Sequence, residues 1–292
     1  MLKKNLKEDL SAIPFLLPFT LLYMTFTIFP VLQGIYISLH RWSLMGRLRF
    51  IGVDNYLKLF QDDLFYEALK NTTLFVLLST PTMIVTALFL ALLANRKTKV
   101  QKFLRVSYYL PSVLSVSVIS YITIFMARPY MGFTNGLLHS LGITGLDTEL
   151  FFLTDPSLVW GTIVIATIWW TVGFNMMLYL SALQDIPDQL YEAAGIDGAT
   201  KWQQFTRITL PQLKPTTKLL TLLQAIASFK VFGQIWLITK GGPGHATRPL
   251  IQYIYQTGFE RSHMGYSASM SYILFVLLVI LGVLQTRLNK AN

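Results

Sequence analysis

The chain has 292 residues, of which 53% are hydrophobic and 13% are charged, and it contains no cysteine. Soluble globular proteins average roughly 45–50% apolar and about 25% charged residues, so this composition indicates a membrane protein. The missing cysteines exclude disulfides, thiol chemistry and cysteine-ligated metals. The net charge is +10, but nucleic-acid binders cluster Lys and Arg on one face. Here the charges lie between apolar segments, so no nucleic-acid partner is expected.

Six apolar segments are long enough to cross a bilayer, which takes about 20 helical residues. We expect spans at about 13–39, 73–94, 106–127, 158–180, 219–238 and 266–284. The first exceeds the apolar core of about 7–15 residues that a signal peptide has, so we expect it to be retained. The predicted fold is an all-α integral membrane protein with six transmembrane helices in a single transmembrane domain, 1–292.

Charge density predicts the orientation of these spans. With six spans, both termini lie on the same side of the membrane. One set of segments carries 14 Lys and Arg in 66 residues; it comprises the two termini, 95–105 and 182–218. The other set carries 9 in 87 residues and comprises 40–70, 127–156 and 239–264. The positive-inside rule makes the denser set cytoplasmic. The N- and C-termini and the loop 182–215 are therefore predicted to face the cytoplasm.

The loop 182–215 is the most informative polar stretch. Asp188 follows a proline and is expected to be the N-cap of a short helix, where the helix dipole favours its carboxylate. Small and apolar residues follow at helical spacing, namely Leu190, Ala193 and Ala194. A short helix with an alanine surface suits close approach by another protein.

Two glycines and a proline are expected to shape the rest of this loop. Gly195 and Gly198 are expected to break the short helix, and Gly195 to allow a sharp turn beside a docked partner. A second helical stretch, 199–210, is expected to stop before Pro211.

The same residues resemble the EAA loop of ABC importer permeases. The motif reads Glu192-Ala193-Ala194, three residues, then Gly198; Asp197-Gly198-Ala199 followed by Phe205, Ile208, Leu210 and Pro211 resembles its carbohydrate branch. The resemblance implies a cytoplasmic coupling helix that docks in a cleft of the ATP-hydrolysing subunit. The implied coupling residues are Tyr191, Glu192, Ala193, Ala194, Gly195, Asp197 and Gly198. An amphipathic connector on the membrane surface is the alternative.

Two further motifs resemble sugar importer permeases. Phe50-x-Gly52-x-x-Asn55-Tyr56 followed by Phe60 resembles a segment after their first span, and Gly241-Gly242-Pro243 resembles their outer turn after the fifth. The resemblance implies the type I permease architecture in a bacterial cell (inner) membrane. The implied partners are a second homologous permease, two ATP-binding cassette subunits and an extracellular or periplasmic solute-binding protein. ATP and Mg would bind the cassette subunits, so no cofactor is expected on this chain.

Catalytic and metal-binding constellations are not apparent in the sequence. Gly241-Gly242-Pro243-Gly244 is followed by His245, so it is not a phosphate loop of the GxxxxGK[ST] type. The 4 histidines fall in outer loops, and no acidic residue falls within an expected span. We therefore expect neither an enzyme nor a metal site. An acidic ion relay is poorly supported, although a secondary, ATP-independent carrier remains the alternative function.

Polar and aromatic residues within two spans form helical stripes. The fourth span has Thr167, Trp170, Thr171 and Phe174 on one face, and the fifth has Gln224, Ala227, Ser228 and Val231. Hydroxyls, an amide and aromatic rings suit a sugar, which needs hydrogen bonds and apolar stacking surfaces. By resemblance, maltose-type permeases line a sugar cavity from these segments. Ordinary packing, with hydrogen bonds between spans, is the equally weighted alternative.

Lys230 is the only full charge well inside an expected span. A lysine at the centre of a spanning helix costs roughly 2.5–3.5 kcal/mol on insertion scales, and such residues are functional by default. We expect Lys230 either to line a water-filled cavity or to pair with a carboxylate of another subunit. A structural lysine that snorkels to the interface is the alternative.

Overall fold

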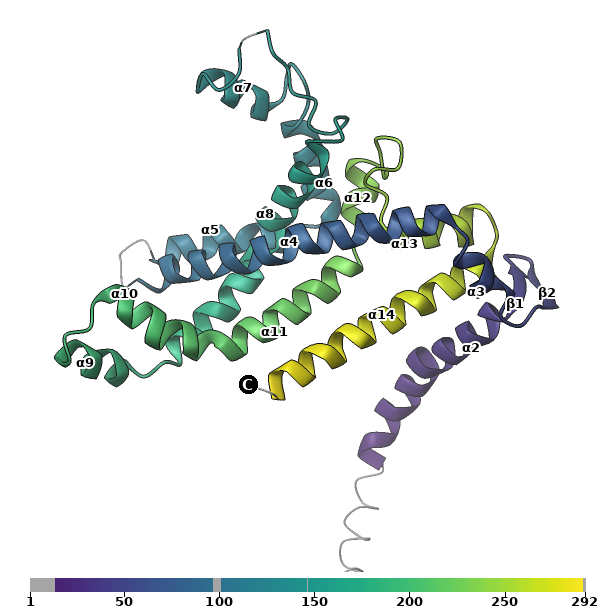
Figure 1. Cartoon of the computed structure of the whole chain (residues 1–292), viewed down its shortest axis with the longest axis horizontal. Helices are drawn as coiled ribbons and strands as arrows, with labels where there is room; N and C mark the ends of the chain where they lie inside the picture. The colour runs from purple at the N-terminus through teal and green to yellow at the C-terminus, as the bar shows by residue number, and fades with distance from the viewer. Residues whose placement is uncertain (1–13, 97–100, 146, 291–292) are drawn as a thin grey trace, which may run out of the picture. The chain divides into compact units, whose positions relative to one another are not determined.

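The computed structural model describes residues 14–96, 101–145 and 147–290, and almost all regular structure in this part of the chain is helical (Figure 1). The basic lead-in 1–12, residue 13 and the basic stretch 97–100 lie outside the described residues. The chain divides into two compact units. One comprises residues up to Asp63 with Ile254–Leu277, and the other comprises Leu64–Tyr253 with residues from Leu278 onward.

Four helices in the described ranges are long and apolar enough to cross a membrane. They are Pro14–Ser38, Asp63–Asn95 (α4), Val159–Gln184 (α8) and Met264–Arg287, the last being most of α14 (Met264–Lys290). These helices contain the first, second, fourth and sixth expected spans. Composition therefore located these four spans, although α4 runs well beyond the expected 73–94.

The third and fifth expected spans are broken rather than continuous helices. The stretch 106–127 is divided between α5 (Gln101–Val113) and α6 (Val116–Met126), which are bent by 101°. The stretch 219–238 is divided between α11 (Leu210–Phe229) and α12 (Gly233–Ile238). Hydropathy measures how apolar a segment is, not whether its backbone continues, and irregular backbone at membrane depth is tolerated where it lines a cavity.

The first unit contains the N-terminal helix, followed by a short β-hairpin and a short helix. The helix Pro14–Ser38 includes a π-helical turn η1 (Met24–Ile28) and ends in α2 (Phe29–Ser38). A hairpin of β1 (His40–Ser43) and β2 (Gly46–Phe50) follows, then α3 (Asp54–Leu59). The all-α prediction missed this antiparallel hairpin because strands of four and five residues give too short a pattern to recognise.

The motif Phe50-x-Gly52-x-x-Asn55-Tyr56 connects this hairpin and α3 to the end of α2. Gly52 has a φ of +57°, which glycine adopts without strain. The buried amide of Asn55 donates to the carbonyls of Ser38 at 2.7 Å and His40 at 3.1 Å. Tyr56 and Ser38 share a hydroxyl hydrogen bond of 2.8 Å. The motif thus has a structural role, closing the segment after the first span.

The second unit packs α4, α8 and α11 around an apolar core. Its α4 members are small or flexible, namely Met83, Ala87, Ala91 and Ala94, and they face Val172, Met176, Tyr179 and Leu180 of α8 and Leu213 and Leu220 of α11. Small residues let helix backbones approach closely within a membrane, where packing rather than hydrophobicity drives association. Gly173 of α8 leaves no room for a side chain, because a Cβ there would lie 2.4 Å from the carbonyl oxygen of Tyr108.

The Gly-Gly-Pro loop of the second unit is tied to the start of α4. The amide of Asn71 donates to the carbonyls of His245 at 2.9 Å and Arg248 at 3.2 Å, and the amide N–H of Leu250 donates to the Thr72 hydroxyl at 2.8 Å. Gly241 has a φ of +87°, and a Cβ there would meet the side chain of Gln252 at 2.7 Å. The remaining helices of this unit are α7 (Phe133–Ser140), α9 (Asp188–Ile196), α10 (Lys201–Gln204) and α13 (Leu250–Tyr255).

Candidate functional site

The short helix expected in the EAA-like loop is α9 (Asp188–Ile196), and it starts one residue earlier than predicted. Pro187 is the N-cap, with an extended ψ of 129°, and no side chain caps the helix there. Asp188 is the first helical residue, so the N-cap prediction for it was wrong. Its carboxylate still lies in the first turn, where the helix dipole favours a negative charge.

The end of α9 depends on Gly198 rather than on Gly195. Gly198 has a φ of +76°, its amide donates to the carbonyl of Gly195 at 3.1 Å, and Ala199 donates to the carbonyl of Ala194 at 2.8 Å. This is the Schellman arrangement, in which a left-handed residue closes a helix. The prediction that Gly195 also breaks the helix was wrong, since it lies within α9.

No contact among the described residues explains a glycine at position 195. A Cβ built there would find its nearest neighbour, the side-chain nitrogen of Gln204, only at 4.0 Å. The described part of the chain therefore has room for a larger residue at this position.

The second helical stretch continues through Pro211 instead of stopping before it. Thr200 and Gln203 form a reciprocal capping box that starts α10. A π-helical turn, η2 (Phe205–Thr209), follows, in which Leu210 N–H bonds the carbonyl of Phe205 five residues back, and α11 begins directly after it. The prediction treated Pro211 as a helix stop, and this was wrong. The π-helical turn just before Pro211 continues the helix, and the first turn of an α-helix tolerates proline.

One side of α9 is anchored on the body of the unit. The Tyr191 hydroxyl and the Thr209 hydroxyl lie 2.9 Å apart, and the amide of Gln204 donates to the Tyr191 carbonyl at 3.4 Å. Tyr191 also packs on the apolar core beside Ile208. Tyr191, one of the predicted coupling residues, is half-buried, and its hydrogen bonds hold α9 in place.

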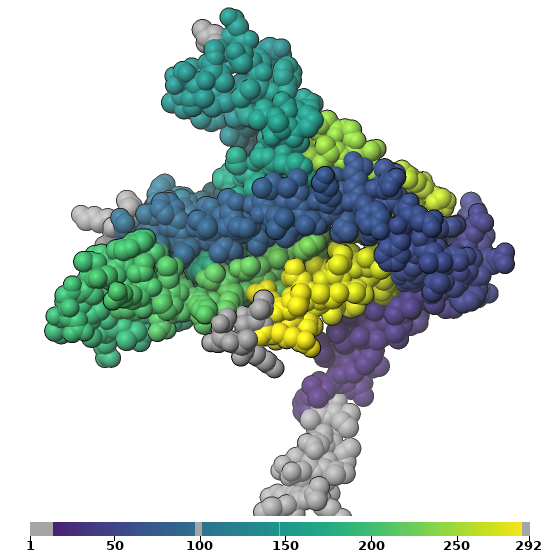
Figure 2. All heavy atoms as spheres, viewed as in Figure 1, coloured from purple at the N-terminus to yellow at the C-terminus, as the bar shows by residue number. Residues whose placement is uncertain are grey.

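The other side of α9 is a surface that no described residue of the second unit covers. Of the predicted coupling residues, Glu192, Ala193, Gly195, Asp197 and Gly198 are exposed, and Ala194 is half-buried. Sequence reasoning missed two large apolar neighbours, Ile196, which is 88% exposed, and Trp202, which is 70% exposed. Figure 2 shows this segment on the surface at one end of its unit. We call residues 188–202 the coupling surface.

The seven residues predicted to line a substrate cavity all line one cavity, of about 610 Å³. Thr167, Trp170, Thr171 and Phe174 come from α8, and Gln224, Ser228 and Lys230 from α11 and its C-terminal end. The other lining residues come from α4, α5, α6, further positions of α8 and α11, the segment between α11 and α12, and the start of α12. We call this space the α8–α11 cavity.

The two helix breaks create the α8–α11 cavity. Ser115 caps α6 after the break, accepting a hydrogen bond from the N–H of Val118 at 3.4 Å. The indole N–H of Trp170 donates to the carbonyl of Leu114 at 3.0 Å, which satisfies a carbonyl that the break leaves without a helical partner. Trp170 therefore both lines the cavity and stabilises the bend.

Hydrogen bonds connect the cavity's amides and hydroxyls into two groups. In the first, Asn175 donates to Gln224 at 3.4 Å, Gln224 donates to Ser228 at 3.2 Å, and Ser228 lies 3.0 Å from the Ser79 hydroxyl. In the second, Gln234 donates to the Thr167 hydroxyl at 2.6 Å. Three of these four bonds join different helices, as the packing interpretation of the stripes predicts. They leave each side chain with fewer hydrogen-bonding positions for a ligand.

Lys230 lies at a helix end rather than inside a continuous span. It is the C-cap of α11, its side chain is exposed, and it lines the α8–α11 cavity. A cation at a helix C-terminus gains about 0.3–1 kcal/mol from the dipole, which offsets only part of the roughly 2.5–3.5 kcal/mol for a lysine at membrane depth. The helix end therefore lowers the free-energy cost of the Lys230 charge, and an anionic partner would offset the rest.

Sequence reasoning missed several residues of the cavity. Asn175 follows Thr171 by four residues on the same helix face, so helical spacing could have found it. Gln234 lies beyond the break, and Phe75, Tyr109 and Phe232 come from other segments. No periodicity within one span points to these four, because the tertiary fold alone brings them together.

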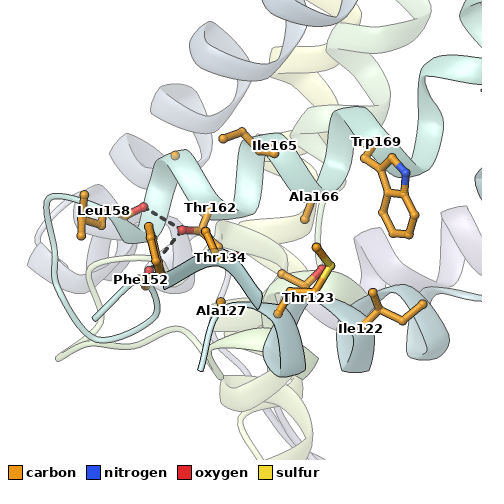
Figure 3. Close-up of a pocket in the computed structure, with 12 residues that line it drawn as sticks. Ile122, Thr123, Ala127, Thr134, Phe152, Leu158, Thr162, Ile165, Ala166 and Trp169 are labelled. Atoms are coloured by element: carbon orange, nitrogen blue, oxygen red, sulfur yellow. Dashed lines mark hydrogen bonds between the residues drawn. The ribbon is translucent and has the colours of Figure 1, made fainter. Parts of the chain in front are cut away.

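A second cavity, of about 470 Å³, lies between α6, α8 and the segment that precedes α8 (Figure 3). Its lining is almost entirely apolar, including Ile122, Ile165 and Trp169. The hydroxyl of Thr162 donates to the carbonyls of Phe152 and Leu158, as the dashed lines in Figure 3 mark. This cavity lacks the convergent polar groups that a sugar requires, so it is not assigned to substrate. No cluster of three potential metal ligands occurs among the described residues.

Comparison with known proteins decides which family this fold and these sites belong to. Residues 83–291 match the family described as "Binding-protein-dependent transport system inner membrane component". The chain belongs to this family. It is 34% identical over 281 residues to the probable ABC transporter permease protein YurN of Bacillus subtilis (strain 168), with 95% of each chain covered. It is also 34% identical over 282 residues to the lactose transport system permease protein LacF of Rhizobium radiobacter, covering 95% of this chain and 93% of that protein.

A solved structure shows the same fold. The chain is similar to a chain in the crystal structure of a bacterial alginate ABC transporter in complex with an alginate pentasaccharide-bound periplasmic protein, with a TM-score of 0.87 and 27% identity. The match covers 99% of this chain and 96% of that one. The protein is thus a multi-pass permease subunit with the ABC importer permease fold, and such subunits are not enzymes themselves. The secondary-carrier alternative finds no support among these relatives.

Proposed function

We propose that this permease is one of two homologous membrane subunits of an importer that moves a sugar or related polar solute into the cell. Two ATP-binding cassette subunits would drive it, binding ATP and Mg, and an extracellular or periplasmic solute-binding protein would deliver the solute. The bacterial cell (inner) membrane would hold it as a single domain, 1–292, with six spans. Support for a sugar comes from relatives that are named for lactose and alginate.

The observation that carries this proposal is the path of α8. One helix contributes five lining residues of the α8–α11 cavity and then leads, after Gln184, directly into the coupling surface. Figure 1 shows α9 and α7 at opposite ends of α8. A push on α9 is therefore transmitted to the cavity along one rigid element, as alternating access requires.

Charge and packing both support the proposed orientation of the chain. The positive-inside rule predicts that the coupling surface faces the cytoplasm, where an ATPase would be. The side chain of Gln285, near the end of α14, donates to the carbonyl of Lys218 on α11, which follows the coupling surface. This contact supports a cytoplasmic C-terminus on the same side as the coupling surface.

In this mechanism the exposed residues of α9 dock in a cleft of the cassette subunit. Glu192, Ala193, Ala194, Gly195 and Asp197 provide the contact, and the room around Gly195 admits a neighbour that a side chain would exclude. Closure of the two cassettes pulls on α9 and switches the cavity between outward and inward access. Thr167, Trp170, Thr171, Phe174, Gln224, Ser228 and Lys230 contact the sugar in passage.

Co-purification with a matched pair of glycine variants tests the proposal. The chain is expressed with its chromosomal neighbours and purified by a tag in mild detergent, and the bound subunits are identified. We expect an ATPase and a second permease with the wild type, and loss of the ATPase with Gly195→Leu. Gly136→Leu, in the open helix α7, is the control and should retain all subunits.

Two results would contradict the proposal. One is retention of the ATPase by Gly195→Leu at wild-type stoichiometry. The other is a chain that purifies alone and still moves solute into vesicles without ATP, which would favour a secondary carrier.

A further inference from the structure

The polar side chains of the α8–α11 cavity differ in whether the chain itself uses their hydrogen-bonding groups. Within the described structure, every hydroxyl, amide and indole of the lining makes a hydrogen bond to a neighbour except at one position, and no ion pair is recorded for the cavity's lysine. The two groups without a recorded partner are the phenol of Tyr109 and the ammonium of Lys230. A ligand in the cavity therefore meets one neutral hydroxyl and one cation that make no hydrogen bond or ion pair within the described structure.

Lys230 is also the only charged side chain among the residues that line this cavity. An uncharged sugar needs only hydroxyls, amides and aromatic faces for recognition, and the cavity has all of these. An ammonium at membrane depth is unfavourable without an opposite charge. No carboxylate of the lining supplies that charge, so an anionic group on the ligand is the partner that suits it.

The rest of the cavity is built for a sugar ring. Phe75, Trp170, Phe174 and Phe232 bring aromatic rings to the lining, and such rings stack on the apolar faces of sugars. The cavity volume of about 610 Å³ lies within the usual range for small-ligand sites, about 300–1,000 Å³. A ligand that satisfies all of these features has a sugar ring that bears one singly charged anionic group.

We propose that the α8–α11 cavity binds an acidic sugar, a uronic acid unit whose carboxylate pairs with Lys230 and accepts a hydrogen bond from Tyr109. This inference rests on the proposed importer function and narrows its substrate class. A carboxylate carries one negative charge, which one ammonium matches. A phosphate monoester carries about −1.5 to −2 at neutral pH, which one ammonium matches less well.

Binding to two sugars that differ only in charge tests the inference. The importer is purified with the subunits that accompany this chain, placed in nanodiscs without binding protein, and titrated calorimetrically with digalacturonate and with its dimethyl ester. We expect digalacturonate to bind at least about tenfold more tightly than the uncharged ester. Lys230→Met should abolish that preference by weakening digalacturonate alone, and Lys230→Arg should preserve it.

Two further variants sharpen the result. Lys218→Met removes the same charge from the same helix outside the cavity, so it should leave both affinities unchanged. Tyr109→Phe should weaken digalacturonate about threefold, as expected for one lost hydrogen bond.

Several outcomes would overturn the inference. Equal affinity for the acid and the ester would do so, and so would a Lys230→Met variant that weakens both equally, which would indicate a structural lysine or one paired with another subunit. Tighter, Lys230-dependent binding of glucose 6-phosphate would overturn the carboxylate assignment. An importer that takes up uncharged disaccharides but binds no uronate would also contradict it.

ATP-dependent uptake in proteoliposomes separates this inference from the function on which it rests. A complex without an ATPase that takes up no sugar on addition of ATP contradicts the importer proposal. A complex with ATP-driven sugar uptake but no preference for charge contradicts the acidic-sugar inference alone.

Discussion

The coupling surface and the α8–α11 cavity lie in the same unit but are stabilised in opposite ways. The hydrogen bonds that hold the coupling surface join near neighbours in sequence, the longest of them linking Tyr191 to Thr209, 18 positions apart. Those of the cavity join distant segments, such as Ser79 and Ser228, which are 149 positions apart. Local bonds position a small helix whose outer face stays free for a partner. Long-range bonds create a cavity whose interior polar groups are largely used.

The same difference appears in the apolar residues. The coupling surface leaves Ile196 and Trp202 in solvent, whereas Tyr179 and Met176, on α8 beyond the cavity, are fully buried. Exposed tryptophans are enriched among the residues that dominate protein–protein binding energy. We therefore expect substitutions at the cavity to affect folding first and substitutions at the coupling surface to affect assembly first.

The largest expected effect is at Gly173, where α5 and α8 cross. Gly173→Ala places a Cβ 2.4 Å from the Tyr108 carbonyl oxygen, so α5 and α8 must separate and the cavity wall deforms. We expect a loss of about 3 kcal/mol in stability, measured as a fall in the melting temperature of the purified complex. Gly161→Ala on the same helix has open space and should be neutral. Equal melting temperatures for the two variants would show that the crossing is not tight.

A smaller effect, on assembly alone, is expected at Trp202. Its ring is 70% exposed and lies tilted against Phe205, at 5.6 Å between centroids, so removing it should leave the fold intact. We expect Trp202→Ala to weaken binding of the ATPase about thirtyfold, equivalent to about 2 kcal/mol, as for an interface hot spot. Surface plasmon resonance with the purified ATPase measures this. Trp169→Ala, an exposed indole outside the coupling surface, is the control. A Trp202→Ala variant that binds normally would exclude the ring from the interface.

The smallest effect is expected at Gly198, within the coupling surface. Gly198→Ala places a Cβ on a residue with a φ of +76°, which costs about 1 kcal/mol for a residue other than glycine. The bonds that close α9 should then open more often. Hydrogen exchange of the Gly198 and Ala199 amides should accelerate about fivefold, with the melting temperature of the complex unchanged. Unaltered exchange would mean that the left-handed turn is not strained by a side chain.

The sequence predicted the local features well, because short-range rules govern them. Helical spacing and the glycine and proline positions indicated a short helix from Asp188 that ends near Gly195 and Gly198, and the structure has α9 there (Asp188–Ile196). Composition located four long apolar helices. The errors in this region were also local. Asp188 is the first helical residue rather than the cap, Gly195 does not break the helix, and Pro211 does not end the following one, because a π-helical turn precedes it.

The two stripes on the fourth and fifth expected spans are a mixed case. Their residue types and spacing grouped eight positions that do share one cavity, and Lys230, singled out for its charge, lines the same cavity. The breaks after Val113 and Phe229, which form that cavity, left no signal in hydropathy. Lys230 was therefore expected inside a continuous helix, although it lies at a helix end. The β-hairpin at 40–50 was missed for a related reason, since its strands are too short to show a period.

The sequence by itself determined that this protein is an apolar, helical membrane chain with a small-residue helix on a polar loop and no apparent catalytic centre. These properties follow from composition and from spacing over a few residues. Only the tertiary structure decided that α11 ends at Lys230, that Tyr191 faces inward, and that Gln234 bonds Thr167 across 67 positions. The physical reason is that burial and helix breaks depend on which segments pack together, and no local pattern records that choice.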